Sequence, residues 1–517
     1  MELLLELARG IGLNKTKRIN VVTGDPKSTN LYDKFYRALA QGRITSDEEA
    51  MALLYPKGVT KSAYHKLKSQ LLDRVYTNAY FIDFKARGGS DLSLAKAKVL
   101  RLGQLTFILA GLGMIKNRRK LLRKLRDLTD TYQLTLAGIR AYHDSMHLAG
   151  LNGNQAAFQQ YKERYLELSR IRRREDIVGI GWYEVSSISN SINTKMQDLT
   201  PIVDQAIQNL AEVPSAPDTA DFIYHKALLQ FSKHHYLGDY REGAKILEAA
   251  LQKMGNLPFL HITGFIALQL NLISCYMSLR DRPAAERCID EYMVVCKAKS
   301  NLNSFKMAQL RCLLAFQVRD YSDAYRYYKQ AVDDRTFPKY KAYLEESYTT
   351  YNVYLYILHQ AGYLPEYAAQ RSLRPQRFLN EVPEFSKDKQ RRNIPILISH
   401  FILLLFQKKY DSIIDRYEAI AKYRDRYLDK HRNYRANLFF RILAEVVRAD
   451  FHLAPFERRS RRYRDLLDTV PPNVIEPTYD QEIISYEALY DIIRENLEGA
   501  PVGAKRRLAD TPATATV

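Results

Sequence analysis

The sequence predicts an all-α protein, and three observations support this prediction. From about residue 96 onward, apolar residues recur at helical spacing almost without interruption. Runs that alternate apolar and polar residues between turns, as strands do, are almost missing. The helical stretches end at short clusters of Gly, Pro, Asn or Asp, of which Gly150–Asn154, Pro214–Pro217 and Asp281–Pro283 are clear examples. We therefore expect a succession of helices joined by short turns.

The composition is that of a globular protein with a sizeable core. The chain has 517 residues, of which 46% are apolar, enough for two or three domains. Its four cysteines match no zinc or redox spacing, and a secreted disulfide framework would need more of them. The first ten residues lack the features of a signal peptide. We therefore expect a cytoplasmic protein.

Two apolar stretches are longer than the others, from Leu102 to Ile115 and from Ile394 to Phe406. Both are interrupted by polar residues, and both are too short to span a bilayer. We therefore predict that each forms a buried helix.

The net charge of +20 is unevenly distributed. Residues 1–175 contain 32 Lys and Arg against 16 Asp and Glu, a surplus of +16, which leaves +4 for the remaining residues. Such an asymmetry indicates contact with nucleic acid, with another polyanion or with an acidic protein.

Residues 1–90 are predicted to form a separate basic helical unit. Ser46 and Glu49 have the spacing of a capping box, which opens a short helix that ends at Pro56–Gly58. A longer helix starts at Thr60. Its predicted buried stripe consists of Tyr64, Leu67, Leu71 and Val75.

A second face of that longer helix carries Lys61, His65 and Lys68. A short helix, a tight turn with Gly and a longer helix with a basic face resemble a helix-turn-helix, and this resemblance implies DNA binding. The alternative is an ordinary connection between two helices, with exposed polar residues of no special function.

Residues 91–213 are expected to form further basic helical hairpins, with the strongest charge cluster in one helix. Seven cations and no acidic residue occur between positions 116 and 126: Lys116, Arg118, Arg119, Lys120, Arg123, Lys124 and Arg126. This basic amphipathic helix is expected to contact phosphates or an acidic partner, or to lie on an anionic membrane surface. The alternative is a solvated outer face. With Lys61, His65 and Lys68, these seven residues are the candidate polyanion-binding residues.

Residues 214–495 contain an irregular repeat. After a turn, a helix carries a small, a bulky and a second small residue at steps of four and three. Two matches are close, Gly243, Leu247, Ala250 and Ala324, Tyr328, Ala331; two are looser, Ala285, Ile289, Tyr292 and Ile413, Tyr417, Ile420. The turns lie at Asp239, Asp281, Asp320 and Lys409. The last interval is about twice as long as the other two, and it contains a degenerate unit near Tyr363.

This pattern resembles the second helix of tetratricopeptide repeats, in which small residues let two helices approach closely. The resemblance implies an α-solenoid of antiparallel helical hairpins, with repeats longer than is usual in that family. It also implies a scaffold that binds a protein or peptide partner through the concave surface of its hairpins.

No catalytic motif is evident, and we expect no cofactor or metal. Gly24–Thr29 resembles the end of a phosphate-binding loop, but Pro26 stands where Gly is required. His143 and His147 share a helical face as zinc ligands do, yet no third ligand is identifiable. The chain is therefore predicted to be non-enzymatic, although an enzyme with a dispersed site is a third possibility.

Most of the 37 tyrosines are expected to be packing residues with their hydroxyl groups at the rim. Residues 496–517 are expected to be disordered.

Overall fold

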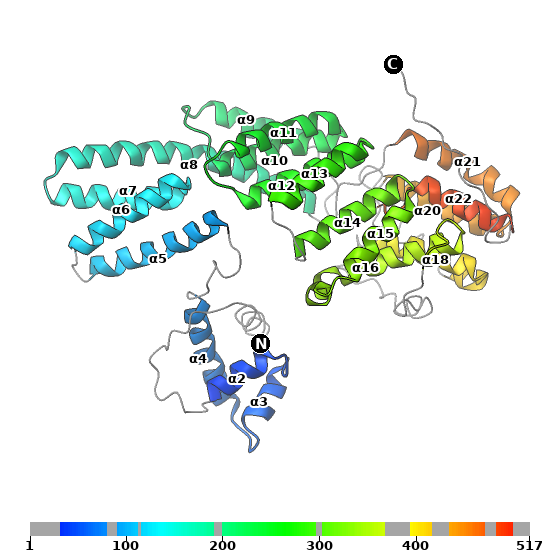
Figure 1. Cartoon of the computed structure of the whole chain (residues 1–517), viewed down its shortest axis with the longest axis horizontal. Coiled ribbons are helices and arrows are strands. Elements are labelled where there is room, and N and C mark those ends of the chain that lie inside the picture. Colours follow the sequence, from blue (N-terminus) through cyan, green and yellow to red (C-terminus); the bar gives the residue numbers. More distant parts are fainter. Residues whose placement is uncertain are drawn as a thin grey trace. The chain divides into compact units, whose positions relative to one another are not determined.

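The computed structural model describes residues 31–79, 90–111, 115–190, 199–295, 302–367, 393–415, 434–470 and 482–499. Every regular element in these ranges is a helix, so the predicted all-α class is confirmed (Figure 1). The loop at 24–29, Cys296 and the tail beyond residue 499 lie outside the described residues.

The chain divides into two compact units, one of residues 1–172 with 257–261 and the other of residues 173–256 with 262–517. The helices of the first unit are α2 (Leu31–Ala40), α3 (Asp47–Leu54), α4 (Lys61–Ala79), α5 (Asp91–Gly111), α6 (Ile115–Thr131) and α7 (Thr135–Leu151). Helix α8 (Gln155–Asn190) begins in the first unit and ends in the second.

Helices α2, α3 and α4 share a hydrophobic core of their own. The Ser46 hydroxyl accepts a hydrogen bond from the Glu49 amide (3.2 Å), and the Glu49 carboxylate accepts one from the Thr45 amide (2.7 Å). The capping interaction predicted for α3 is therefore present. The stripe predicted on α4 is buried throughout, at Tyr64, Leu67, Leu71 and Val75.

Helix α6 packs against both α5 and α7. The contacts bury Val99 and Leu102 of α5 with Leu122 and Leu125 of α6. Only one face of α5 is covered in this way.

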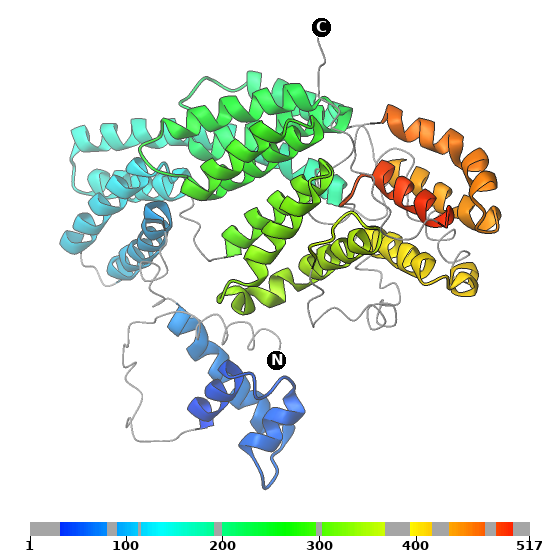
Figure 2. The same cartoon turned by 45° about the vertical axis from the view of Figure 1, so that its right-hand side comes forward.

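The second unit contains the end of α8 and twelve further described helices: α9 (Thr200–Ala211), α10 (Ala220–Leu237), α11 (Tyr240–Gly255), α12 (Ile262–Ser278), α13 (Arg282–Val295), α14 (Leu302–Gln317), α15 (Tyr321–Val332), α16 (Phe337–Gln360), α18 (Asn393–Phe406), α20 (Tyr434–Arg448), α21 (Leu453–Thr469) and α22 (Tyr486–Leu497). Consecutive helices pack in pairs, α10 on α11, α12 on α13, α14 on α15 and α20 on α21 (Figure 2).

One type of turn recurs after α10, α12, α14, α16, α18 and α20. In each turn a residue with positive φ is followed by a residue whose amide donates a hydrogen bond to the carbonyl five positions earlier, as in a Schellman motif. In the second unit the donating residues follow one another at nearly equal intervals, at Asp239, Asp281, Asp320, Tyr363, Lys409 and Phe451. The same turn also follows α2, α6 and α7 in the first unit, at Arg43, Leu134 and Asn154. The series thus includes a regular turn at Tyr363, where the sequence showed only a degenerate unit.

Several successive turns contact one another. The Arg282 guanidinium pairs with Asp320 at 3.0 Å and with Asp323 at 2.9 Å. The rings of Tyr321 and Tyr363 lie 6.1 Å apart, edge to face. The rings of Tyr410 and Phe451 stack at 4.2 Å.

The small residues of the repeat have the predicted packing role. A Cβ atom on Gly243 would lie 3.2 Å from the Phe231 ring, so α10 and α11 approach closely there. The positions equivalent to Gly243 in α13 and α15, Ala285 and Ala324, are fully buried. Tyr417 and Ile420 of the fourth match lie outside the described residues.

The tyrosines of α15 and α16 that the sequence assigned to packing include Tyr328, Tyr348, Tyr351 and Tyr354, and these four are buried. The expectation that the hydroxyl groups lie at the rim is wrong for two of them. Tyr348 donates to the Phe305 carbonyl at 2.8 Å and Tyr354 to the Pro395 carbonyl at 3.0 Å, both in the interior. A buried carbonyl provides the partner that water would otherwise supply.

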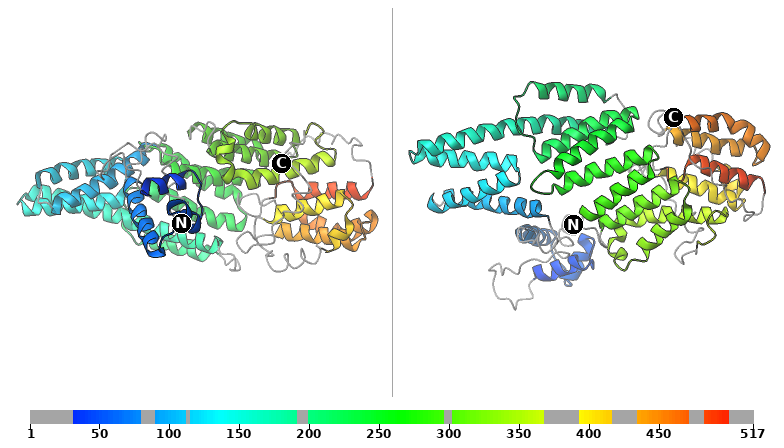
Figure 3. Two further views of the ribbon diagram at one scale, coloured as in Figure 1. Left: turned by 90° about the horizontal axis from the view of Figure 1, so that it is seen from below. Right: turned by 45° about the horizontal axis from the view of Figure 1, so that its top comes forward.

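Helix α22 and the residues before it are buried almost continuously from Glu482 to Ile493. The helix packs against α18, α20 and α21, as both views of Figure 3 show in red, yellow and orange. The residues before α22 also bond to the end of α14, where the Gln317 side-chain amide donates to the Ile483 carbonyl at 3.2 Å. The Tyr363 hydroxyl donates to Glu495 at 2.9 Å.

The two long apolar stretches have different environments. The second stretch, from Ile394 to Phe406, forms α18 and is buried, as predicted. The prediction of a buried helix is wrong for the first stretch, from Leu102 to Ile115, because Leu105, Phe107, Ile108 and Ile115 are exposed. Helix α5 buries only the face that includes Leu92, Ala95, Val99, Leu102 and Thr106, so its opposite face remains open in the described part of the chain. No described helix is long and apolar enough to cross a membrane.

Candidate functional site

The seven cations of α6 fall into two groups. Five of them are exposed and follow one face of the helix at steps of three, one, three and one: Lys116, Arg119, Lys120, Arg123 and Lys124. This α6 basic face lies opposite the buried Leu122 and Leu125. None of the five forms an ion pair with another described residue.

The other two cations of α6, Arg118 and Arg126, point toward neighbouring helices. Arg118 lies 3.3 Å from the carboxylate of Asp144 on α7. Arg126 donates to the Ser145 hydroxyl on α7, and its guanidinium lies 4.4 Å from the centre of the Tyr161 ring on α8. These two arginines therefore hold α6 in place and are not part of its exposed face.

The described part of the chain places no third metal ligand beside both His143 and His147. Both side chains are exposed, and the His143 ring lies 3.3 Å from Asp144, whose carboxylate is already paired with Arg118. The described residues contain no group of three His, Cys, Asp or Glu that could hold a metal ion. Asp144, which stands where a metalloprotease has its general base, is thus an ion-pair partner of an arginine.

The three candidate residues of α4 also differ in their environments. Lys68 forms an ion pair with Asp47 of α3 at 2.8 Å, which joins the two helices. Lys61 and His65 are exposed. Only two of the three residues that suggested a DNA-binding face are therefore available to a phosphate.

The described thiols are unsuited to nucleophilic chemistry. Cys275, Cys288 and Cys312 are free and buried. Burial raises the pKa of Cys275 and of Cys288 to about 12, and the pKa of Cys312 also lies well above its usual value. All three are protonated at neutral pH, whereas the thiolate is the reactive form.

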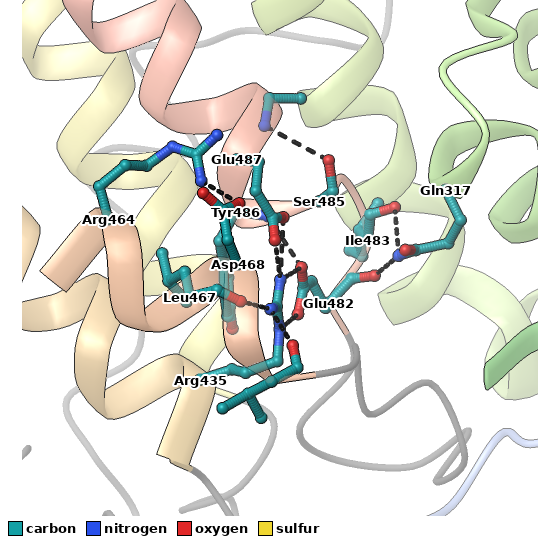
Figure 4. A network of polar contacts seen from close by, with 12 residues as sticks. Gln317, Arg435, Arg464, Leu467, Asp468, Glu482, Ile483, Ser485, Tyr486 and Glu487 are labelled. Carbon is teal, nitrogen blue, oxygen red and sulfur yellow. Dashed lines mark hydrogen bonds and ion pairs between the residues drawn. The ribbon is translucent and has the colours of Figure 1, made fainter. Parts of the chain in front are cut away.

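A buried polar network joins α20, α21 and the start of α22 (Figure 4). Arg435 of α20 donates to Glu482 from Nε at 2.9 Å and from Nη2 at 2.8 Å, and Nη2 also bonds Glu487 at 2.9 Å. Its Nη1 donates to the carbonyls of Leu467 (2.7 Å) and Val470 (2.6 Å) at the end of α21. All three charged side chains are buried.

No local sequence pattern pointed to this network, because Arg435 and Glu482 are 47 positions apart. The network holds one positive and two negative groups, and burial raises the pKa of Glu482 although Arg435 opposes that shift. The Tyr486 amide donates to Glu482 at 2.8 Å, so both ends of the carboxylate are engaged. We assign the network to the stability of the second unit, because its groups are bonded to one another and closed to solvent.

Among the described residues, the α6 basic face gathers five exposed cations without ion pairs along one side of a helix, whereas α21 gathers three, Arg458, Arg461 and Arg462. Such a stripe attracts anions and is destabilising by itself, because like charges three or four residues apart repel. It is the candidate functional site. Compared with known proteins, the chain matches no protein-family model, no curated protein and no solved structure.

Proposed function

We propose that the chain is a non-enzymatic helical-repeat scaffold of the cytoplasm that binds a protein or peptide partner. The proposal rests on the turn that recurs six times at nearly equal intervals, with small residues packed behind it. A repeated helical pair cannot bury its apolar face alone, so successive pairs stack and create an extended surface. In this proposal the stack is a tetratricopeptide-like α-solenoid of antiparallel hairpins.

The longer repeat fits such a solenoid. The interval from Asp239 to Asp281 exceeds the length of a tetratricopeptide repeat by roughly two helical turns, one for each helix of a pair. Longer helices widen the surface that each repeat offers to a partner, and the fold itself leaves the partner unspecified.

Crosslinking in the native cell followed by purification and mass spectrometry tests the scaffold function. We expect a protein partner in constant ratio to the chain, with crosslinks on the helices between residues 220 and 469. Crosslinks confined to residues 1–172, or the absence of a protein in constant ratio, would contradict the proposal. Release of a small-molecule product by the purified chain would contradict its non-enzymatic part.

A nucleic-acid-binding regulator is the second candidate function, and the α6 basic face favours it. Five exposed cations on three turns of one helix can follow a phosphate backbone. Lys61 and His65 of α4 add a smaller basic surface.

Binding to duplex DNA and to single-stranded RNA over a series of salt concentrations tests this second function. Changing Arg119, Arg123 and Lys124 to Ala removes three phosphate contacts, so the slope of log affinity against log salt should fall by about 2 to 3. The matched control changes Arg458, Arg459 and Arg461 to Ala, three exposed arginines of α21, and should leave the slope unchanged. No binding at low salt would exclude the function.

A further inference from the structure

The connected ends of α5 and α6 expose an unusual density of apolar side chains. Leu105, Phe107 and Ile108 of α5 are 45%, 72% and 44% exposed, and Ile115 of α6 is 48% exposed. We call these four residues the α5–α6 tip. With Leu100 they place five exposed large apolar side chains in one short stretch, whereas no other described stretch of equal length holds more than two. Such a concentration marks an interaction surface.

The cations of the α6 basic face begin directly behind this tip. Lys116 follows Ile115, Arg119 and Lys120 lie about one turn further, and Arg123 and Lys124 about two turns further. At a rise of 1.5 Å per residue the cations are spread from about 2 to about 14 Å behind Ile115 along the axis of α6. The three apolar side chains of α5 lie about 4 to 9 Å from the end of that helix at Gly111. The end of this helix pair therefore carries apolar side chains on α5 and cations on α6 at similar distances from the two helix ends.

We propose that the α5–α6 tip and the α6 basic face dock the protein on an anionic lipid surface. The tip enters the boundary of the acyl chains, and the cations contact the charged headgroups. This arrangement needs no membrane-spanning helix. It is independent of the scaffold function, since the tip belongs to the first unit and the evenly spaced turns from Asp239 to Phe451 belong to the second.

The charge and chemistry of the surface favour a lipid over other occupants. A second copy of the chain would bring two sets of five uncompensated cations together. Nucleic acid would engage the cations and could stack a base on Phe107, but it would leave Leu105, Ile108 and Ile115 without apolar contacts, because bases stack on aromatic rings. Around α5, Leu105 and Phe107 lie about 100° to either side of the buried Thr106, and Ile108 lies on the opposite side, so these side chains line no single groove for a partner's side chains.

Flotation of the full chain with vesicles tests the proposal. Vesicles of phosphatidylcholine with 30% phosphatidylglycerol should carry the protein at about 0.1 M salt, and pure phosphatidylcholine should carry at least about tenfold less. Changing Lys116, Arg119, Lys120 and Arg123 to Ala should reduce partitioning at least about tenfold. The control in which Arg458, Arg459 and Arg461 become Ala should leave partitioning unchanged.

The apolar contribution is tested separately. Phe107→Ser with Ile108→Ser should reduce partitioning about tenfold or more, whereas Leu136→Ser with Leu166→Ser, two exposed leucines of α7 and α8, should not. Circular dichroism checks that each variant is folded. As a conservative second variant, Phe107→Trp in a background that has Trp182→Phe provides a single fluorophore, and its emission should shift to the blue on addition of the anionic vesicles.

Three results would overturn the proposal. One is the absence of binding to the anionic vesicles. Another is binding to the vesicles that the alanine variant abolishes and the serine variant leaves unchanged, because such binding is a purely electrostatic contact with the headgroups that does not use the tip. The third is an emission of the Phe107→Trp variant that does not shift on vesicle binding.

Discussion

Arg435 shows how one side chain fixes the junction of three helices. Its five N–H groups all find acceptors, two on the carbonyls that end α21 and the others on Glu482 and Glu487. Losing the arginine would leave buried carboxylates without a counter-charge, and a broken buried ion pair is far more costly than an absent one.

We therefore expect Arg435→Met to lower the free energy of unfolding by about 3 to 5 kcal/mol at pH 8. Burial already raises the pKa of Glu482, and removal of the guanidinium raises it further. A carboxyl group whose pKa is higher in the folded than in the unfolded state destabilises the fold above that pKa, and the penalty falls as the pH decreases through it. The loss should accordingly be smaller at pH 5 than at pH 8, as measured by urea unfolding at both values.

Two controls accompany this measurement. Arg458→Ala, at an exposed position of α21, should change the free energy by less than about 0.5 kcal/mol. Adding Glu482→Gln and Glu487→Gln to Arg435→Met should remove the pH dependence. An equal loss at both pH values in the single variant would show that the carboxylates do not determine the cost.

At the scale of the element, the recurring turn depends on one residue with positive φ. Glycine takes this position in two of the six turns of the second unit, at Gly238 and Gly362, and Arg280 and Arg319 take it in two others. A side chain with a Cβ atom is strained in this conformation, whereas glycine is not. The turns are then continued by an N-cap, as where Asp281 accepts a hydrogen bond from the Ala284 amide at 3.0 Å.

Turns with glycine and turns with arginine at the positive-φ position lead to opposite predictions for the effect of a substitution on stability. A Cβ atom on Gly238 would meet no atom within 4 Å, so Gly238→Ala should cost about 1 kcal/mol through the backbone alone. Arg280 is exposed and has a φ of 58°, so Arg280→Gly should stabilise the protein by about 0.5 to 1 kcal/mol. Thermal and urea unfolding measure both changes. Shifts of the same sign would contradict the role assigned to the turn.

At the scale of the whole molecule, contacts between distant parts of the chain complete the second unit. Helix α22 occupies an interior position among α18, α20 and α21, and Gln317 bonds to a carbonyl 166 residues later in the sequence. By contrast, α2, α3 and α4 have a separate core. A change in α22 should therefore spread through the second unit but not to these three helices.

Leu489 of α22 is fully buried, and Leu489→Ala should destabilise the second unit by about 2 to 5 kcal/mol. Hydrogen exchange should become faster in α14, α15 and α16 as well as in α22, while residues 31–79 keep their rate. Glu498→Ala, at an exposed position after the same helix, serves as the control. Faster exchange confined to residues 482–499 would show that α22 is an appendage to the unit.

Local patterns in the sequence were sufficient to predict much of the fold. The buried stripe of α4, the cap of α3 and the small residues of α11 and α15 all follow from neighbours within four positions along one helix. The same local spacing indicated the five cations of the α6 basic face. Arg118 lies four positions before the buried Leu122, so the same spacing places it on the inner side of α6. Arg126 lies at the edge of the basic face, and its inward direction depends on a partner on another helix.

The sequence by itself thus determined that the chain is helical, where several helices begin and end, and that α6 is basic. Only the tertiary structure decided which faces are covered, as shown by the exposure of Phe107, the pairing of Lys68 with Asp47 and the burial of Arg435. The physical reason is that helix periodicity is set by hydrogen bonds between residues four positions apart. Burial and ion pairing depend instead on helices that the chain brings together from distant positions, and no local pattern encodes them.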